Sequence, residues 1–440
     1  MTPMSNGAFG RDSGMSRRQA LGLGALAIGG IPLAAACSNG GDSGGGSAVA
    51  AQGEKYADFE LTSYGLSEDP PSAWLKKTIS EYESEHDLTV TTHSYPWDSA
   101  LNQMLLRSRS GELHGVAQIS AEWLAPMAAA GKLVDISSIA AEADYTEAAA
   151  RLGTLEGTQY AFPWTSGAIG LIANSELLDE AGIGDTPTTV DEFEEALRAI
   201  KDLGSDMVPY AASTKAATLK DFVAWAQTFG SPIIEDEKCT LGDEQSIAAM
   251  AWYQKLYKDG LIASEIDRNA ARTLFAQKRT AFYDDAPVGV GIISSSSSDK
   301  DIASKMVPFS RPVPSPDDTP HEQAWGNILV IADGPGSAAA AQFCLWITTD
   351  QTKQIEHLKI VGTAPTTTAG LELPEVKDNE FIATFSKAIT PNAAPSPLWK
   401  FTNYSQMQKA ISDEVEKGLL GEASAKDAME AARDAINELI

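Results

Sequence analysis

Cysteine and histidine are scarce in this chain, with three and five residues among 440. The histidines are scattered, and the sequence contains no HExxH or CxxC spacing. Such a composition offers a structural or catalytic metal few ligands, so we expect no metal and no other resident cofactor. No apolar run is long enough to cross a bilayer as a permanent helix, so we also expect no transmembrane span.

Basic residues are few beside acidic ones, 33 against 60, which gives a net charge of −27. So acidic a chain attracts nucleic acid or anionic lipid poorly, and we expect its charges on a solvated surface. Hydrophobic residues still make up 43% of the sequence, enough for the cores of two lobes. Cys344 lies in the apolar run AQFCLWI and is expected in a core, with a disulfide to Cys239 as the alternative.

The first 36 residues have the order of an export signal. Arg17 and Arg18 precede an apolar run, broken only by glycines, over residues 21–31. The following letters LAAAC resemble the lipobox of bacterial lipoproteins, which implies cleavage before Cys37 and a diacylglyceryl group on its sulfur. Because two or more acyl chains anchor a protein stably, the mature chain would stay at the membrane. SRRQAL resembles a twin-arginine signal, which favours Tat export over Sec.

Residues 37–55 form a glycine- and serine-rich stretch that we interpret as a lipidated flexible linker. Its letters GDSGG, at residues 41–45, match the nucleophile motif of trypsin-like proteases. That chemistry needs a serine held rigidly beside a histidine and an oxyanion hole, and a flexible linker holds nothing rigidly. We therefore assign no catalytic residue there.

Strand and helix patterns alternate from residue 56 onward. DFELTSY (58–64) alternates apolar and polar residues, and PSAWLKKTISEYESEH (71–86) has an apolar helical face. LTVTTHSY (88–95) predicts a second strand and WDSALNQMLLRSRSG (97–111) a second helix. This rhythm predicts an α/β fold.

Three further helices have clear boundaries in the sequence. TTVDEFEEALRAIKDLG begins with a capping box of Thr189 and Glu192, DEQSIAAMAWYQKLYKDG stops at Gly260, and SAKDAMEAARDAINEL starts at Ser424. Residues 294–298 and 312–320 are rich in serine or proline and predict solvated loops.

Four blocks of sequence, in their order along the chain, resemble the extracellular solute-binding proteins of bacterial ABC importers, the family of the maltose and oligosaccharide receptors. They are GELHGVAQISAEWLAPMAAAGKLVDIS, GTQYAFPWTSGAIGLIANSELLDEAGI with TPTTVDEFEEALRAI, LFAQKRTAFYDDAP, and AWGNILVIADGPGSAAAAQFCLWITTDQTKQ with VGTAPTTT. The resemblance runs from about residue 56 to the end. The chain departs from the family pattern at His114-Gly115, Thr158-Gln159, Ala173 and Val190.

The resemblance implies an α/β, two-lobed periplasmic-binding-protein fold of type II with three hinge crossings. The crossings would fall near Thr165-Ser166, near Trp325-Gly326 and near Thr366 to Thr368. After the export signal (1–36) and the linker (37–55), lobe I would comprise residues 56–164 and 327–366. Lobe II would comprise residues 165–326 and 367–440.

A receptor for an uncharged sugar must cover the sugar's apolar faces with flat rings and pair its hydroxyls with carboxylate or amide groups. Both kinds of side chain occur where loops follow strands, and we predict as ligand-binding residues Tyr64, Trp97, Glu122, Trp123, Trp164, Asp284, Asp285, Trp325 and Trp399. For each loop tryptophan the alternative is a core plug, and for the aspartates a solvated turn. Trp74, Trp252 and Trp346 lie on apolar helical faces and are assigned to the core.

The function implied is capture of a carbohydrate, and more specifically an oligosaccharide, without catalysis. A monomer held by palmitate-type acylation on the outer face of the cytoplasmic membrane would deliver the sugar to an ABC permease and its ATPase. Alternatives are a receptor for another solute such as a glycerol-3-phosphate diester, an exported carbohydrate-active enzyme, and a surface adhesion or sensor protein. A phosphate would call for arginines in the cleft, and the loops chosen above contain none. A glycosidase needs two spaced carboxylates.

Overall fold

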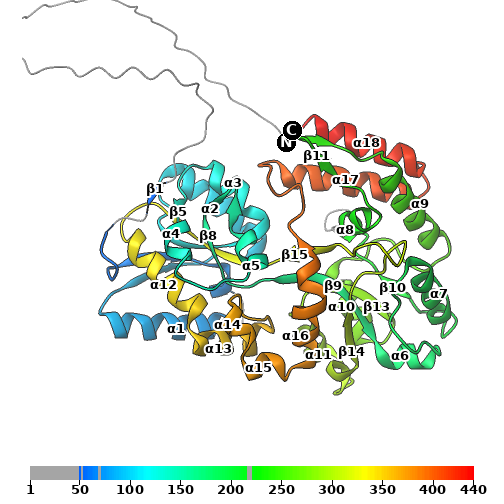
Figure 1. Ribbon diagram of the computed structural model, residues 1–440, viewed down its shortest axis with the longest axis horizontal. Helices are drawn as coiled ribbons and strands as arrows, with labels where there is room; N and C mark the ends of the chain where they lie inside the picture. The colour runs from blue at the N-terminus through cyan, green and yellow to red at the C-terminus, as the bar shows by residue number, and fades with distance from the viewer. Residues whose placement is uncertain (1–48, 51–52, 68–70, 216–220) are drawn as a thin grey trace, which may run out of the picture. The chain divides into compact units, whose positions relative to one another are not determined.

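The structure, a computed structural model, describes residues 49–50, 53–67, 71–215 and 221–440 (Figure 1). The chain divides into the units Met1–Gly45 and Gly46–Ile440, and everything described below belongs to the second. The predicted export signal and Cys37 lie outside the described residues and stay predictions. None of the described helices has the length and apolar character needed to cross a membrane.

The first sheet has five strands in the order β3-β2-β4-β16-β8 (Figure 1). β3, β2 and β4 run parallel, whereas β16 is antiparallel to both of its neighbours. β16 has the letters NILVIA and is buried after its first residue, as is typical of a strand covered on both faces. The strands are β2 (Phe59–Thr62), β3 (Val90–His93), β4 (Gly115–Ser120), β8 (Ala161–Pro163) and β16 (Asn327–Ala332).

Helices surround this sheet, and the two predicted from the sequence form with the expected bounds. α1 begins at Pro71 and ends at His86, and α2 ends before Gly111, whose left-handed backbone (φ 76°) caps the helix. The rings of Phe59, Tyr82 and Phe343 pack together where α1 and α12 meet the sheet. The helices are α1 (Pro71–His86), α2 (Trp97–Ser110), α3 (Leu124–Ala129), α4 (Ser137–Ala140), α5 (Glu147–Leu152), α12 (Ser337–Thr349) and α13 (Gln351–Val361).

The second sheet has six strands, with β10-β13-β9-β15-β17 in order and β14 also paired with β9 (Figure 1). The long strand β9 pairs antiparallel with β13 along one edge, and with β15 followed by β14 along the other. It therefore organises the whole sheet. The strands are β9 (Gly167–Asn174), β10 (Tyr210–Ala211), β13 (Phe282–Asp285), β14 (Met306–Phe309), β15 (Glu322–Trp325) and β17 (Ala393–Ala394).

The helices around the second sheet include the three that were predicted. The capping box of Thr189 and Glu192 is confirmed at the start of α7, and Ser424 caps α18. α18 packs against α9 and α17 (Figure 1). These helices are α6 (Ser175–Glu180), α7 (Val190–Lys201), α8 (Asp221–Thr228), α9 (Glu244–Lys258), α10 (Arg268–Ala276), α11 (Gly289–Ser296), α17 (Tyr404–Leu419) and α18 (Ala425–Asn437).

The loop predicted at residues 294–298 is wrong in its first part, because α11 continues to Ser296. The hydroxyl of Ser294 donates to the carbonyl of Val290 at 2.7 Å, and that of Ser296 donates to Ile292 at 3.1 Å. Serine side chains that bond to the preceding turn satisfy themselves within a helix. The buried Ile293 then holds this turn against the core.

Short elements connect these parts. They are the strands β1 (Val49–Ala50), β5 (Val134–Asp135), β6 (Thr154–Leu155), β7 (Thr158–Gln159), β11 (Ile234–Glu235) and β12 (Lys238–Cys239), the helices α14 (Thr368–Leu371), α15 (Pro374–Lys377) and α16 (Glu380–Thr384), the 3₁₀ turns η1 (Tyr64–Ser67), η2 (Ala121–Trp123), η4 (Ile302–Lys305) and η6 (Thr390–Asn392), and the π-helical turn η5 (Phe385–Ile389). Cys239 and Cys344 are both buried and free, so they form no disulfide.

The chain passes between the sheets three times. The first passage joins β8 to β9 and the second joins β15 to β16 through Gly326, where a Cβ would clash with the carbonyl of Thr165. The amide of Asn327 donates to the hydroxyl of Thr165 at 2.7 Å, which ties these two passages together.

The third passage comes later than predicted. Thr366 still donates to the carbonyl of Pro163 at 2.9 Å, and Thr368 and Ala369 still bond to Asp144, all beside the first sheet. The passage therefore follows α14, and α16 then packs against β14 of the second sheet. We keep the predicted lobe boundaries as a proposal, with this one moved toward the C-terminus.

Candidate functional site

A cavity of about 500 Å³ is lined by residues from both sheets and from the helices and loops next to them. On the first-sheet side it is lined by residues after β2 and β4 and by residues of α1, α2 and α13; those used below are Tyr64, Trp74, Trp97, Glu122, Trp164 and His357. On the second-sheet side it is lined by Arg268 and Arg272 of α10 and by Val288 and Ile292 at α11. Trp325 and Asn327 flank the second passage. Loops after parallel strands are where α/β proteins bind ligands.

Five of the predicted site residues line this cavity together: Tyr64, Trp97, Glu122, Trp164 and Trp325. The hydroxyl of Tyr64 donates to the side-chain oxygen of Asn327, which orients both groups. Trp97 is 43% exposed although it is a large ring. An exposed flat ring at the edge of a cavity offers an apolar face to a ligand.

Trp123 lies behind these residues and is absent from the cavity lining. Its ring packs 5.8 Å from that of Tyr64 and 5.5 Å from that of Trp97, measured between centroids. It is 3% exposed and belongs to the hydrophobic core. Trp123 therefore supports two lining rings and does not contact the cavity, contrary to its predicted role.

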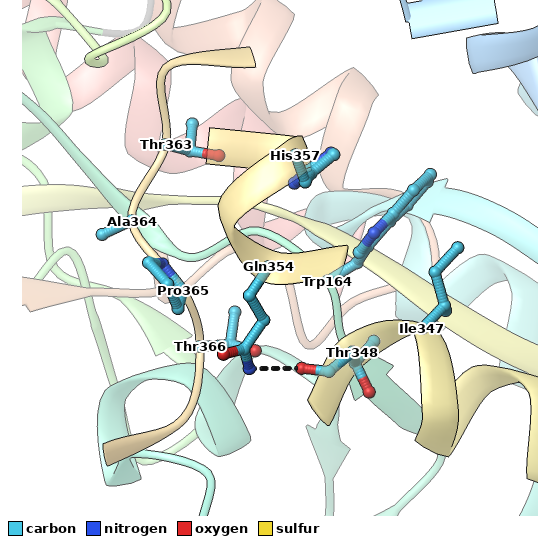
Figure 2. A pocket seen from close by; sticks show the side chains of 9 residues that line it. All are labelled: Trp164, Ile347, Thr348, Gln354, His357, Thr363, Ala364, Pro365 and Thr366. Carbon is cyan, nitrogen blue, oxygen red and sulfur yellow. Dashed lines mark hydrogen bonds between the residues drawn. The ribbon is translucent and has the colours of Figure 1, made fainter. Parts of the chain in front are cut away.

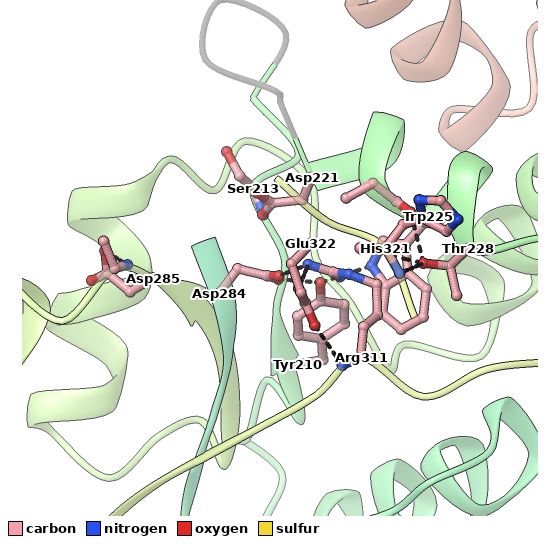
Figure 3. A network of polar contacts seen from close by, with 12 residues as sticks. Tyr210, Ser213, Asp221, Trp225, Thr228, Asp284, Asp285, Arg311, His321 and Glu322 are labelled. Carbon is pink, nitrogen blue, oxygen red and sulfur yellow. Dashed lines mark hydrogen bonds and ion pairs between the residues drawn. The ribbon is translucent and has the colours of Figure 1, made fainter. Parts of the chain in front are cut away.

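Asp284 and Asp285 also do not line the cavity, because all four residues of β13 are buried (Figure 3). The carboxylate of Asp284 accepts hydrogen bonds from Arg311 and Tyr210. The two oxygens of Asp285 accept from Nε and Nη2 of Arg272 at 2.7 and 2.8 Å. Buried carboxylates require such partners, so these aspartates pair with arginine side chains of the protein and are unavailable to a ligand.

Trp399 lies at a different place. It lines a second cavity of about 250 Å³ with Arg151, Lys400 and the segment 395–397. The structure therefore does not bring Trp399 together with the other predicted tryptophans.

Two arginines that the sequence analysis missed line the cavity. Arg268 donates from Nη2 to the buried carboxylate of Asp221 at 2.6 Å, and Arg272 makes the bidentate pair with Asp285. The loops chosen from the sequence contain no arginine, and these two lie on the helix α10 instead. Their spacing of four residues places both on one face of α10, but the sequence does not show that this face borders a cavity. Each arginine nevertheless has a buried carboxylate beside it, so its charge is matched within the protein.

A fully buried polar network lies behind these arginines (Figure 3). Arg311 pairs with Asp284 and with Glu322, and its guanidinium carbon lies 4.6 Å from the ring centre of Trp225. Trp225 in turn donates to the hydroxyl of Tyr210 at 3.0 Å. Burial raises the pKa of Glu322 to about 7, although the charge of Arg311 opposes that rise. The network fixes β13, which carries both aspartates.

Two further residues line the first-sheet side of the cavity. Trp74 was predicted to lie in the core, and His357 was not predicted as a site residue. Trp74 is buried, as predicted, yet it also lines the cavity beside Trp164. Behind Trp164 and His357 lies a small pocket (Figure 2). Into it face Trp164, Gln354 and Thr363, each with a buried polar atom that has no hydrogen-bond partner among the described residues.

The lining of the cavity suits binding better than hydrolysis. Among the described residues Glu122 is the one carboxylate in its wall, whereas a glycosidase needs a pair. Nor does the described part of the chain contain three His, Cys, Asp or Glu side chains grouped so that they could hold a metal. Rings, amides and charge-matched guanidinium groups can instead cover and hydrogen-bond a polar, uncharged molecule.

A family model for bacterial extracellular solute-binding proteins matches residues 77–384. The chain belongs to this family. It is therefore a solute-binding protein and not an enzyme, in agreement with the lining of the cavity.

The relatives extend this result to the fold. The diacetylchitobiose binding protein DasA of Streptomyces coelicolor is 24% identical over 180 residues, which are 40% of this chain and 42% of that protein, so the match spans less than half of its length. The GacH receptor of Streptomyces glaucescens superposes with a TM-score of 0.75 at 20% identity, over 88% of this chain and 99% of that one. MalE of Xanthomonas citri gives 0.76 at 18% identity, over 87% and 97%. The predicted two-lobed fold of type II is confirmed.

Proposed function

We propose that this protein is the substrate-binding lipoprotein of an ABC transporter, and that it captures a carbohydrate, an oligosaccharide, between its two lobes and delivers it to a membrane permease. The observation that carries the proposal is the cavity itself. Flat rings and hydrogen-bonding groups from both sheets line it, and its volume of about 500 Å³ falls within the ~300–1,000 Å³ usual for small-molecule sites.

The rings on the first-sheet side support a sugar ligand. Trp97 and Trp164 offer flat apolar surface, and the C–H faces of a pyranose are apolar. Glu122, Gln118 and Asn327 line the same cavity and can pair with hydroxyl groups. A sugar presents both kinds of surface at once.

The arginines on the second-sheet side support an uncharged ligand over an anionic one. Asp221 and Asp285 match the charges of Arg268 and Arg272, so the cavity offers no excess positive charge to a phosphate. The guanidinium groups can still donate to hydroxyls through their remaining N–H bonds. A glycerol-3-phosphate diester, the alternative within the family, is therefore the weaker proposal.

The names of the relatives agree with a carbohydrate. DasA is called a diacetylchitobiose binding protein, the GacH receptor was crystallised with acarbose, and MalE3 of T. maritima was crystallised with maltose. These ligands are all oligosaccharides or their analogues. We extend that chemical class, and no particular member of it, to this chain.

The mechanism follows from a cavity built by both sheets. A ligand that contacts both sides has more contacts when the lobes are closed, so it shifts the open–closed equilibrium by its difference in affinity. The closed monomer would then dock on the permease, whose ATPase drives import. Acylation of Cys37 after Tat export would hold the protein on the outer face of the membrane and raise its concentration near the transporter.

A thermal-shift panel tests the ligand class. Maltose, maltotriose, diacetylchitobiose, glucose and glycerol 3-phosphate are each added in excess to the purified protein. A ligand at 100 times its Kd should stabilise the protein by about 2.7 kcal/mol, and we expect this from at least one oligosaccharide. Stabilisation by glycerol 3-phosphate alone, or turnover of a chromogenic glycoside, would contradict the proposal.

Labelling of the cells with palmitate tests the anchor separately. The wild-type chain should take up label and sediment with membranes, whereas Cys37→Ala should do neither. Label in the variant, or its absence in both, would remove the lipoprotein part of the proposal and leave the ligand class standing.

A further inference from the structure

His357 stands out among the residues of the cavity because it is a polar group inside an aromatic cluster. It lies in the second half of α13 and is 8% exposed. Its ring stacks on that of Trp164 (Figure 2). The ring centroids are 5.0 Å apart and the planes differ by 14°. The ring of Trp74 packs against it at 5.1 Å and 40°. Trp164 thus covers one face of the imidazole, and Trp74 packs beside both rings, with its own centroid 6.2 Å from that of Trp164.

The edge of this imidazole has no polar partner in the described part of the chain. No hydrogen bond or ion pair between its ring nitrogens and another described residue is present. The ring nitrogens of His357 are not among the fully buried unpaired atoms of the described residues, so they can be reached from the cavity and can hydrogen-bond a ligand group there. The main cavity and the small pocket behind Trp164 both border His357.

We propose that His357 is a ligand-contacting residue, whose imidazole hydrogen-bonds through a ring nitrogen to a hydroxyl group of the sugar in the main cavity. The inference rests on the proposed function, which it deepens by naming a polar contact on the first-sheet side that no sequence motif indicates.

The charge state of His357 agrees with a hydroxyl partner. Burial lowers the pKa of His357 to about 4, so the ring is neutral at neutral pH. A neutral imidazole has one donor and one acceptor nitrogen, and a hydroxyl can serve as partner to either. The contact therefore does not depend on which tautomer is present. It would favour an uncharged ligand, as the charge-matched arginines on the second-sheet side do.

The helix that carries His357 is held firmly from both sides. Glu356, the preceding residue, accepts from Nε1 of Trp74 at 3.0 Å. The side-chain amide of Gln354 donates to Thr348 and Thr367 at 2.7 and 2.8 Å. A group fixed in place before binding loses little freedom when the ligand arrives, so its hydrogen bond contributes more to affinity.

His86 provides a matched control within the same chain. It is the last residue of α1 and also stacks on a ring, that of Tyr56, with 4.3 Å between centroids and 14° between planes. Tyr82 packs against it at 4.4 Å, much as Trp74 packs against His357. Yet His86 lies at the far end of α1 from Trp74 and does not line the main cavity.

The test compares His357→Phe and His86→Phe by titration calorimetry with the oligosaccharide that stabilises the wild type most in the panel above. Phenylalanine keeps a flat ring for stacking and removes both nitrogens. We expect His357→Phe to weaken binding about tenfold, which corresponds to one hydrogen bond of ~1.4 kcal/mol, and His86→Phe to bind as the wild type does. Equal affinity of His357→Phe and the wild type would overturn the inference.

A second measurement keeps the inference testable if His357→Phe folds poorly. In wild-type protein labelled with ¹⁵N-histidine, saturation with the same sugar should shift the ring-nitrogen signals of His357 and leave those of His86 in place. Unchanged signals of His357 in the saturated protein would overturn the inference alone. If the wild type binds no sugar of the panel, the proposed function fails, and this inference fails with it.

Discussion

The two sides of the cavity present different kinds of side chain to a ligand. The first-sheet side presents rings, and its polar groups are neutral or few, as Trp97, Trp164 and His357 show. The second-sheet side presents two guanidinium groups, each held by a buried carboxylate. The first side can therefore cover apolar faces, whereas the second can donate hydrogen bonds in fixed directions. The proposed oligosaccharide fits both sides, because it has apolar C–H faces and many hydroxyl groups.

The largest effect should come from breaking the buried network on the second-sheet side. Asp284→Asn removes the carboxylate that pairs with Arg311 and leaves that buried cation to Glu322 alone. We expect a loss of about 3–5 kcal/mol in the free energy of unfolding, measured by urea denaturation. The control is Glu147→Gln, which breaks a pair whose carboxylate side chain is 87% exposed and should change stability by less than about 0.5 kcal/mol. A similar small change in both variants would show that the network is not structural.

On the first-sheet side, His357 should make stability fall on acidification. Its folded pKa of about 4 lies below the value of ~6.5 in an unfolded chain, so the unfolded state takes up a proton first. The stability it contributes is complete above pH ~6.5 and is lost as the pH falls toward 4, by up to about 3 kcal/mol. Unfolding curves of His357→Gln between pH 7 and 4 should lack this part of the loss. Parallel curves for variant and wild type would contradict the prediction.

On the second-sheet side, Glu322 should make stability rise on acidification, the opposite of the effect of His357. Its folded pKa of about 7 exceeds the unfolded value of ~4.3, so the native state holds a proton that the unfolded state has released. This contribution grows as the pH falls from 7 to about 4.5 and is lost as the pH rises again. The stability of the wild type relative to Glu322→Gln should therefore rise on acidification, by up to about 3 kcal/mol. A relative stability that stays constant or falls as the pH is lowered would refute this assignment.

The smallest effect should come from a substitution at the mouth of the cavity that lowers sugar affinity and leaves stability nearly unchanged. Trp97→Ala removes an exposed ring from the first-sheet side and should weaken sugar binding about three- to tenfold, the ~0.5–1.5 kcal/mol typical of an aromatic contact. Its unfolding free energy should change by less than about 0.5 kcal/mol. Leu106→Ala is the control, because Leu106 is exposed on the same helix outside the cavity. Unchanged affinity in Trp97→Ala would exclude the ring from the site.

Local signals in the sequence predicted the elements well. The bounds of α1, the capping box of α7 and the glycine after α2 depend on nearby residues, so they are visible without the fold. The continuation of α11 through its serines was not visible, because it depends on the burial of Ile293 in the tertiary structure. The position of the third passage was also missed, since bonds from Thr366 and Thr368 to distant residues decide it.

The candidate site was predictable only where it consists of loops after strands. Tyr64, Trp97 and Glu122 follow strands of the first sheet, and they line the cavity as expected. Asp284 and Asp285 were also expected at the end of a strand, but both are buried and pair with Arg311, which follows them, and Arg272, which lies on the preceding helix α10. Trp123 and Trp399 show that a ring on a loop can support its neighbours or line a different cavity.

Residues that line the cavity from the middle of helices could not be identified from the sequence. Arg268, Arg272, Trp74 and His357 lie on helices whose faces toward the cavity are set by packing. Periodicity places these residues on a face, but it does not say which face borders a ligand.

The most direct measurement is a calorimetric titration of the wild-type protein, first with the oligosaccharide that stabilises it most and then with glycerol 3-phosphate. The charge-matched arginines and the ring-lined opposite wall predict saturable one-to-one binding of the sugar and no measurable binding of the phosphate ester. Tight binding of the phosphate ester together with weak or no binding of every sugar would contradict the account.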